Sequence, residues 1–155
     1  MPNFLFITEK EIVLKLILAT VLGMLIGLER RLSHKEAGLR TFSLVSLGSA
    51  LFVILGNDII PKYWFNLVGA SIDPTRVLSQ LIVGLGFLGA GLIIFHEKKL
   101  HGLTTAATVW VSSAIGAAVG LGAYISAITA TLIVLFVLII LWRLEKQLKI
   151  SEDEY

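Results

Sequence analysis

The octapeptide HKEAGLRT, residues 34–41, interrupts an apolar sequence with a short basic segment that contains a glycine. A similar segment, KKLHGLTT, occupies residues 98–105 and also lies between two apolar stretches. Glycine breaks a helix readily, and a basic segment favours the cytoplasmic side of a membrane. The two octapeptides therefore predict two helical hairpins of the same design, each with a helix, a basic turn and a returning helix.

The apolar content of the chain indicates a membrane protein. Of its 155 residues, 56% are hydrophobic and 15% are charged, and a soluble domain of this length cannot bury so much apolar surface. Runs such as TLIVLFVLII, residues 131–140, do not alternate as the strands of a membrane barrel do. Since a membrane helix needs about 20 residues, we predict an all-α polytopic membrane protein with five transmembrane helices, over residues 12–28, 41–56, 77–95, 104–121 and 125–141.

We expect one transmembrane domain over residues 1–150 and a disordered acidic tail over residues 151–155. The N-terminus lacks the basic region and the cleavage site of a signal peptide, so the first span is expected to remain in the protein. The chain has no cysteine, which excludes disulfides and thiolate metal sites.

The placement of lysine and arginine predicts the orientation, because cytoplasmic loops are enriched in these residues. The basic turns and the C-terminal segment hold most of them, whereas the few on the other side are accompanied by acidic residues. The N-terminus is therefore expected outside and the C-terminus in the cytoplasm. Lys15, one turn into the first span, is expected to reach outward to the membrane surface.

An internal repeat appears when the sequence is shifted by 64 positions. Polar and glycine matches support it best: Lys35 with Lys99, Gly38 with Gly102, and Thr41 with Thr105. Val45, Ser49 and Ala50 also match Val109, Ser113 and Ala114. Both copies run in the same direction, so we expect two parallel two-helix repeats, related by an axis along the membrane normal, plus a fifth helix.

Spans three and four are rich in small residues, which allow helices to approach closely in lipid. We interpret these residues as helix-packing positions, and the alternative is a polar path or substrate groove. The packing candidates are Gly84, Gly86, Gly89 and Gly91 in span three, and Ser112, Gly116 and Gly120 in a stripe that begins with Thr104 and Thr108.

Charged residues at the ends of the spans supply the other candidates for function. On the cytoplasmic side, Glu29 could pair with Arg40 or with neighbouring bases, and simple topological anchoring is the alternative. His96, Glu97 and His101 lack the spacing of a zinc-binding helix, so no metal ligand is assigned. The cytoplasmic candidates are Glu29, Arg30, Lys35, Arg40, Thr41, Thr104 and Thr105, and those of the outer side and span three are Asp73, Arg76 and Gln80.

Three ordered blocks, GLERRLSHKEAGLRT, DPTRVLSQLIVGLGFLGAG and HGLTTAATVWVSSAIGAAVGLGAY, resemble the signature segments of the MgtC/SapB (YhiD-like) membrane protein family. The resemblance implies about five spans and a cytoplasmic C-terminus. Members of this family are associated with growth at low magnesium, with survival of pathogens inside host cells and with inhibition of the ATP synthase. Longer members carry a soluble ACT-like C-terminal domain, and this chain is similar to the short form.

The function expected from these observations is that of a non-enzymatic inner-membrane protein linked to magnesium homeostasis, which modulates a partner membrane complex such as the ATP synthase. The alternative is a small homo-oligomeric transporter or channel for Mg²⁺ or another cation, and a weaker option is a lipid-active structural protein. Beyond Mg²⁺ no cofactor is expected. The expected partners are the lipid bilayer, further copies of the chain and a membrane complex, whereas nucleic acid is excluded.

Overall fold

The computed structural model describes residues 8–59, 74–96 and 99–148. Within this part of the chain, five helices are long and apolar enough to cross a membrane, which confirms the predicted fold class. The helices are α1 Glu9–Leu32, α2 Leu39–Ile54 with a π-helical turn Leu55–Ile59, α4 Pro74–Leu92, α5 Leu103–Gly120, and α6 Tyr124–Phe136, which continues through a π-helical turn Val137–Leu141 into α7 Trp142–Gln147.

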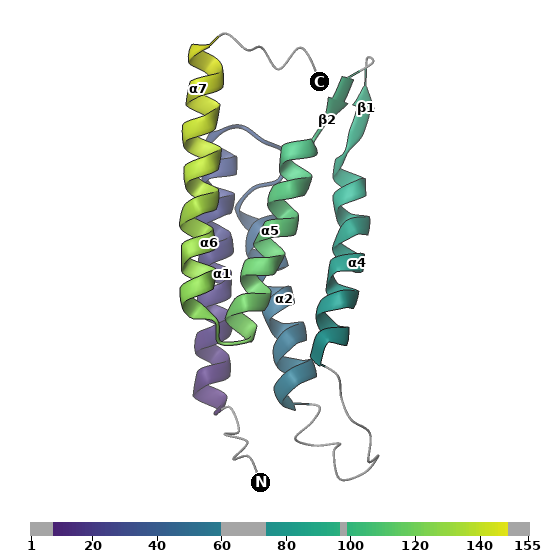
Figure 1. The fold of residues 1–155 in the computed structure, drawn as a ribbon, viewed down its shortest axis with the longest axis vertical. Helices are drawn as coiled ribbons and strands as arrows, with labels where there is room; N and C mark the ends of the chain where they lie inside the picture. The colour runs from purple at the N-terminus through teal and green to yellow at the C-terminus, as the bar shows by residue number, and fades with distance from the viewer. Residues whose placement is uncertain (1–7, 60–73, 97–98, 149–155) are drawn as a thin grey trace.

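The helices stand side by side, as Figure 1 shows. Helices α1, α4 and α6 run from the end that holds the N-terminus, and α2 and α5 run back toward it. Helix α5 contacts α1, α2, α4 and α6, and 61% of its span is buried, compared with 6% of the α4 span. Helix α5 is thus the centre of the bundle, and α4 lies at its edge.

Two glycines start the returning helices, as the repeat predicts. Gly38 is the N-cap of α2 and Gly102 is the N-cap of α5, so both helices begin one residue later, at Leu39 and Leu103. Thr41 and Thr105 lie within the first turn rather than at the start. Gly102 has a φ of 87°, and a Cβ there would overlap the carbonyl oxygen of Leu92, so this position requires glycine.

The second basic turn differs from its prediction. Helix α4 ends at Leu92, three residues before the predicted end of span three, and a short hairpin follows it. The hairpin consists of the antiparallel strands β1 Ile94–His96 and β2 Lys99–His101. β-Branched and aromatic residues, as in the sequence IIF at positions 93–95, favour extended backbone over helix. The first turn, in contrast, contains no strand within its described residues.

The two repeats meet where α2 and α5 run parallel. The hydroxyl groups of Ser49 and Ser113, which the 64-residue shift matches, share a hydrogen bond of 2.6 Å. Matched positions of the two predicted repeats thus contact each other where α2 and α5 meet. This contact is the one expected if the two repeats are related by an axis that runs between α2 and α5.

The small residues of α5 lie against backbone carbonyls of α2. Ser112 donates a hydrogen bond of 3.4 Å to the carbonyl oxygen of Phe42. One turn further, a Cβ on Gly116 would overlap the carbonyl oxygen of Ser46. After another turn, a Cβ on Gly120 would lie 2.8 Å from the carbonyl oxygen of Ala50. The close approach of the central helices thus depends on side chains no larger than serine.

We predict that Gly116→Ala destabilises the protein by about 2 kcal/mol, because its methyl group must displace the α2 backbone in a packed interface. The free energy of unfolding can be measured by denaturant titration in detergent. Gly48→Ala is the matched control on α2, because a Cβ there meets no described atom within 4 Å. Alanine should be neutral or slightly stabilising at this helical position. Equal stability of Gly116→Ala and Gly48→Ala would contradict the packing.

Candidate functional site

A buried arginine links two helices at the end that holds the basic turns. Arg30 lies in the last turn of α1, and its side chain is 4% exposed. Its Nη2 donates a hydrogen bond of 3.4 Å to Oγ1 of Thr105, in the first turn of α5. A buried cation is costly in a membrane protein unless polar groups surround it, so Arg30 and Thr105 are the core of the candidate site.

Glu29 supplies the negative charge of this site. Its side chain is 10% exposed, and Oε2 lies 3.8 Å from Nη1 of Arg30. Oε1 accepts a hydrogen bond of 2.7 Å from the hydroxyl of Ser33. Oε2 is buried and has no hydrogen-bond partner among the described residues. This carboxylate oxygen therefore retains unused capacity to accept a hydrogen bond.

The first basic turn holds the pair in place by capping α1. The amide of Lys35 donates to the carbonyl of Arg30 (3.0 Å), and the amide of His34 donates to that of Arg31 (3.2 Å). These two bonds form a Schellman motif, with His34 in the left-handed position (φ 55°) that glycine usually takes. The turn that begins with HKEA thus fixes the backbone that carries Glu29 and Arg30.

The other cytoplasmic candidates are not all part of this cluster. Lys35 is half-buried and contributes through its backbone, whereas Arg40, Thr41 and Thr104 are exposed. Of the two expected pairings of Glu29, with Arg40 or with a neighbouring base, the structure shows the second, because the Glu29 carboxylate contacts Arg30. Arg40 extends from the first turn of α2 on an exposed face.

A second buried cation lies toward the opposite end of α1. This cation is Lys15, which was expected to reach outward to the membrane surface. The side chain of Lys15 is 7% exposed, and its Nζ lies 3.8 Å from the carboxylate of Glu11. The Nζ donates a hydrogen bond of 3.1 Å to the carbonyl oxygen of Gly120, the last residue of α5. Lys15 therefore points inward and caps α5, where a cation complements the helix dipole. The four-residue spacing of Glu11 and Lys15 in the sequence could have predicted this ion pair, because residues four apart lie on the same face of a helix.

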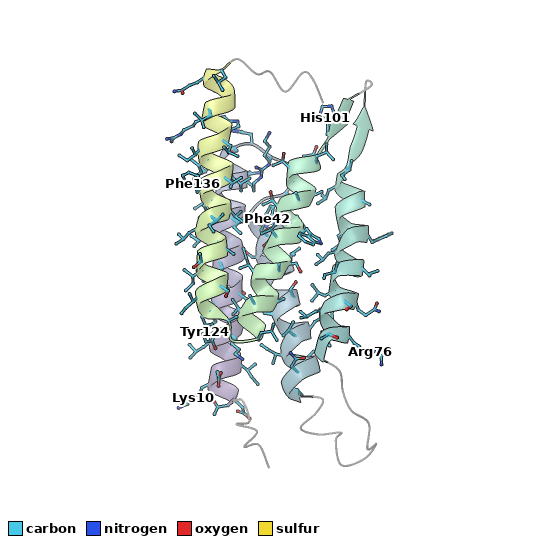
Figure 2. All side chains as sticks on the ribbon, in the orientation of Figure 1. Lys10, Phe42, Arg76, His101, Tyr124 and Phe136 are labelled. Carbon is cyan, nitrogen blue, oxygen red and sulfur yellow. The ribbon has the colours of Figure 1, made fainter. Side chains whose placement is uncertain are left out.

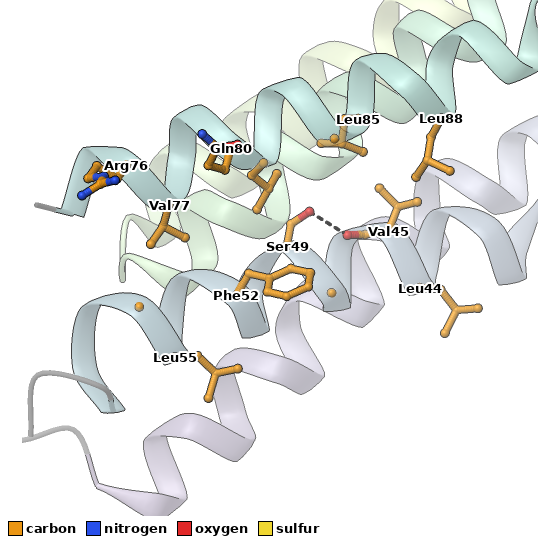
Figure 3. A pocket seen from close by; sticks show the side chains of 14 residues that line it. Leu44, Val45, Ser49, Phe52, Leu55, Arg76, Val77, Gln80, Leu85 and Leu88 are labelled. Carbon is orange, nitrogen blue, oxygen red and sulfur yellow. Dashed lines mark hydrogen bonds between the residues drawn. The ribbon is translucent and has the colours of Figure 1, made fainter. Parts of the chain in front are cut away.

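The outer candidates lie around a groove between α2 and α4. Asp73 falls outside the described residues, whereas Arg76 and Gln80 are exposed and line the groove. Figure 2 shows Arg76 at the end of the bundle where Lys10 lies, and His101 at the opposite end. The groove has a volume of about 990 Å³, and Figure 3 shows its side chains.

The glycines of span three make few contacts within the chain. A Cβ on Gly84, Gly86 or Gly91 would meet no described atom within 4 Å, and one on Gly89 would lie 3.9 Å from Cβ of Ala106. In α1, by contrast, a Cβ on Gly27 would lie 2.8 Å from Cα of Leu39. The predicted close packing at Gly84, Gly86 and Gly91 is thus not made inside the described chain. As for metal ligands, no group of three His, Cys, Asp or Glu within the described ranges is arranged to hold an ion.

Comparison with known proteins gives a consistent result. Residues 16–147 match the sequence model of the MgtC family. The YhiD protein of Escherichia coli strain K12, whose name proposes a magnesium transporter, is 42% identical over 132 residues, which are 83% of this chain and 59% of YhiD. The MgtC protein of Salmonella typhimurium strain LT2 is 41% identical over 79% of this chain and 49% of its own length.

A relative from another genus matches to the same degree. Protein MgtC of Brucella abortus strain 2308 is 43% identical over 77% of this chain and 46% of its own length. The chain thus spans about half the length of the relatives that it matches. No solved structure matches the chain.

We predict that Arg30→Ala lowers the free energy of unfolding by about 3 kcal/mol, because it leaves the buried Glu29 carboxylate without its cation. Arg40→Ala is the matched control on an exposed face and should change this free energy by less than about 0.5 kcal/mol. Both values come from denaturant titration in detergent. Glu29→Gln should recover part of the loss in the Arg30→Ala background, and additive effects of the two substitutions would contradict the pairing.

Proposed function

This chain belongs to the MgtC family of membrane proteins, and on that premise we propose that it serves magnesium homeostasis by modulating a partner membrane complex. The family resemblance makes the ATP synthase the first partner to test. In this proposal the chain is not an enzyme and carries no ions by itself. It lies in the bacterial inner membrane with its N-terminus outside and its C-terminus in the cytoplasm.

The observation that carries the proposal is the exposed surface of α4. Only 6% of this span is buried, and Gly86 and Gly91 on it have no described atom within 4 Å of a Cβ. Phe87 beside them is 82% exposed. In lipid, small residues let a second helix approach closely, while an adjacent large side chain adds contact area. This face is suited to a helix of another membrane protein or of a second copy.

The buried pair supports a regulatory role at the cytoplasmic end. Glu29 and Arg30 belong to the first repeat, and Arg30 contacts Thr105 of the second, so a partner that shifts either repeat would act on this contact. Charged residues buried in membrane proteins are costly and therefore often functional. The basic residues near this end favour the proposed orientation. Those in described segments are Arg30, Arg31, Lys35, Arg40, Lys99, Arg143 and Lys146.

The alternative proposal is a homo-oligomeric transporter or channel for Mg²⁺. The name of the E. coli relative favours it. Within this chain, the buried Oε2 of Glu29 is the oxygen best suited to contact a hard cation. Both proposals use the Glu29–Arg30 pair, but they differ in whether the purified protein moves ions without a partner.

We predict that the protein lowers ATP-driven proton pumping in inverted bacterial membrane vesicles, and that Gly91→Leu relieves this effect at least several-fold. The added side chain would obstruct a helix that docks on α4 but overlaps nothing in the described chain. Ser126→Leu places the same side chain at an exposed position of α6 and should remain as inhibitory as the unaltered protein. Immunoblots must show equal amounts of each variant in the membrane.

A flux measurement on purified protein separates the modulator proposal from the transporter proposal. Purified protein in liposomes is expected to give no Mg²⁺ entry above that of protein-free liposomes, as followed with an enclosed Mg²⁺ dye. Robust entry that Glu29→Gln abolishes and Arg40→Ala preserves would replace the modulator with the transporter. Unaltered proton pumping in the presence of the protein would exclude the ATP synthase as its partner.

A further inference from the structure

The groove between α2 and α4 is apolar along most of its length and polar at one end. Its α2 wall includes Gly48 and Phe52, and its α4 wall includes Leu81, Gly84 and Leu88. Arg76 and Gln80 line the end nearest the start of α4. The side chains in Figure 3 follow this order along the groove. The groove thus has the same polarity as a lipid molecule, with a polar head at one end and an apolar body.

The length of the groove matches one leaflet of a bilayer. Arg76 and Leu88 are 12 residues apart on α4, which corresponds to about 18 Å along a helix. The hydrocarbon core of a bilayer is about 30 Å thick, so one leaflet contributes about 15 Å. Arg76 lies in the first turn of α4, at the end of the bundle that holds the N-terminus. The polar end of the groove therefore lies at that membrane surface.

The 64-residue repeat indicates that the groove is one of a pair. The shift matches α1 with α4 and α2 with α5. Helix α6 packs on α5 and α1, so the place related to that of α6 lies against α2 and α4. In the described part of the chain no helix occupies this second place, and the groove is found there. One groove is filled by a helix of the chain itself, and the other remains open.

The residues at the two related places differ in polarity. The 64-residue shift matches Arg76 with Ile12 and Gln80 with Leu16. Beside the groove that α6 fills, the residues are the apolar Ile12 and Leu16. Beside the open groove, they are Arg76 and Gln80, a cation and an amide. A guanidinium group at this level would make no favourable polar contact with an apolar helix. It can bind a phosphate, because arginine donates two parallel hydrogen bonds to phosphate oxygens.

Two glycines also make room along the walls. Cβ atoms on Gly48 and Gly84 would meet no described atom within 4 Å. Their matched positions in the other repeat are Ser112 and Thr20, which both carry side chains. Glycine on both walls widens the open groove at the depth where the chain of a lipid would lie.

We propose that this groove binds a phospholipid from the leaflet on the side of the N-terminus. One acyl chain lies between the walls that contain Gly48 and Gly84, and the phosphate binds the guanidinium group of Arg76, with the amide of Gln80 as a second donor. This site does not rest on the proposed function, because its lining residues include Gly48 and Gly84 but neither Gly86 nor Gly91.

The test is native mass spectrometry of the full chain, purified in detergent, delipidated and titrated with phosphatidylglycerol. One lipid per chain is expected to bind. Gly84→Leu and Gly48→Leu fill the groove and should each weaken binding about tenfold or more. Ser126→Leu, the bulk control on α6, should bind as the unaltered protein does. Unchanged binding by both groove variants would overturn the proposal.

The head and the tail of the lipid are tested separately. Arg76→Gln should weaken phosphatidylglycerol binding about tenfold but leave the binding of diacylglycerol, which has no phosphate, unchanged. Arg40→Gln is the charge control at the opposite end of the bundle. Inorganic phosphate at millimolar concentration should not displace the lipid, and displacement would show an anion site instead of a lipid site. Arg76 is exposed, so this variant should fold even where a glycine variant does not.

A second copy of the chain is the competing occupant. If a second copy fills the groove, the unaltered protein should be a dimer. Gly84→Leu should then convert it to a monomer with no loss of bound lipid, and that result would overturn the lipid site. A monomer whose bound lipid is lost in Gly84→Leu and kept in Ser126→Leu would support it.

Discussion

The close contact between α2 and α5 is the constraint on which the rest of the structure depends. In a membrane the hydrophobic effect does not drive helices together, so packing and hydrogen bonds must do so. The Ser49–Ser113 hydrogen bond joins matched positions of the two repeats, and Gly116 lets the two backbones meet beside it. Helix α1 is then attached to both ends of α5, through Lys15 at Gly120 and Arg30 at Thr105.

The two repeats share a backbone plan but differ in where they place polar groups. The first repeat carries a buried charge at the end of the basic turns, where Arg30 matches Ile94 of the second repeat. The second repeat carries a cation at the other end, where Arg76 matches Ile12. These differences between the two repeats thus indicate two places for function. One is the ion pair at one membrane surface, and the other is the groove suited to a lipid at the opposite surface. Symmetric packing alone would require neither.

Features that depend on local sequence could be predicted, and features that depend on tertiary contacts could not. Apolar length predicted the five helices, and Gly38 and Gly102 predicted the breaks that precede α2 and α5. The inward direction of Lys15 depends on a carbonyl group 105 residues away, and the partner of Arg30 lies 75 residues away. The groove follows from the position of α4 relative to α2, which span-three composition does not specify. Asp73 and the tail 151–155 lie outside the described residues.

A double cysteine variant tests the central contact most directly. The natural chain has no cysteine, so Ser49→Cys with Ser113→Cys introduces its only two thiols. The two serine oxygens are 2.6 Å apart, so a membrane-permeant oxidant should form a disulfide within one chain. Intact-mass analysis should show the loss of two hydrogens and no further reaction with maleimide. Free thiols, or disulfides only between chains, would contradict an axis that passes between these residues.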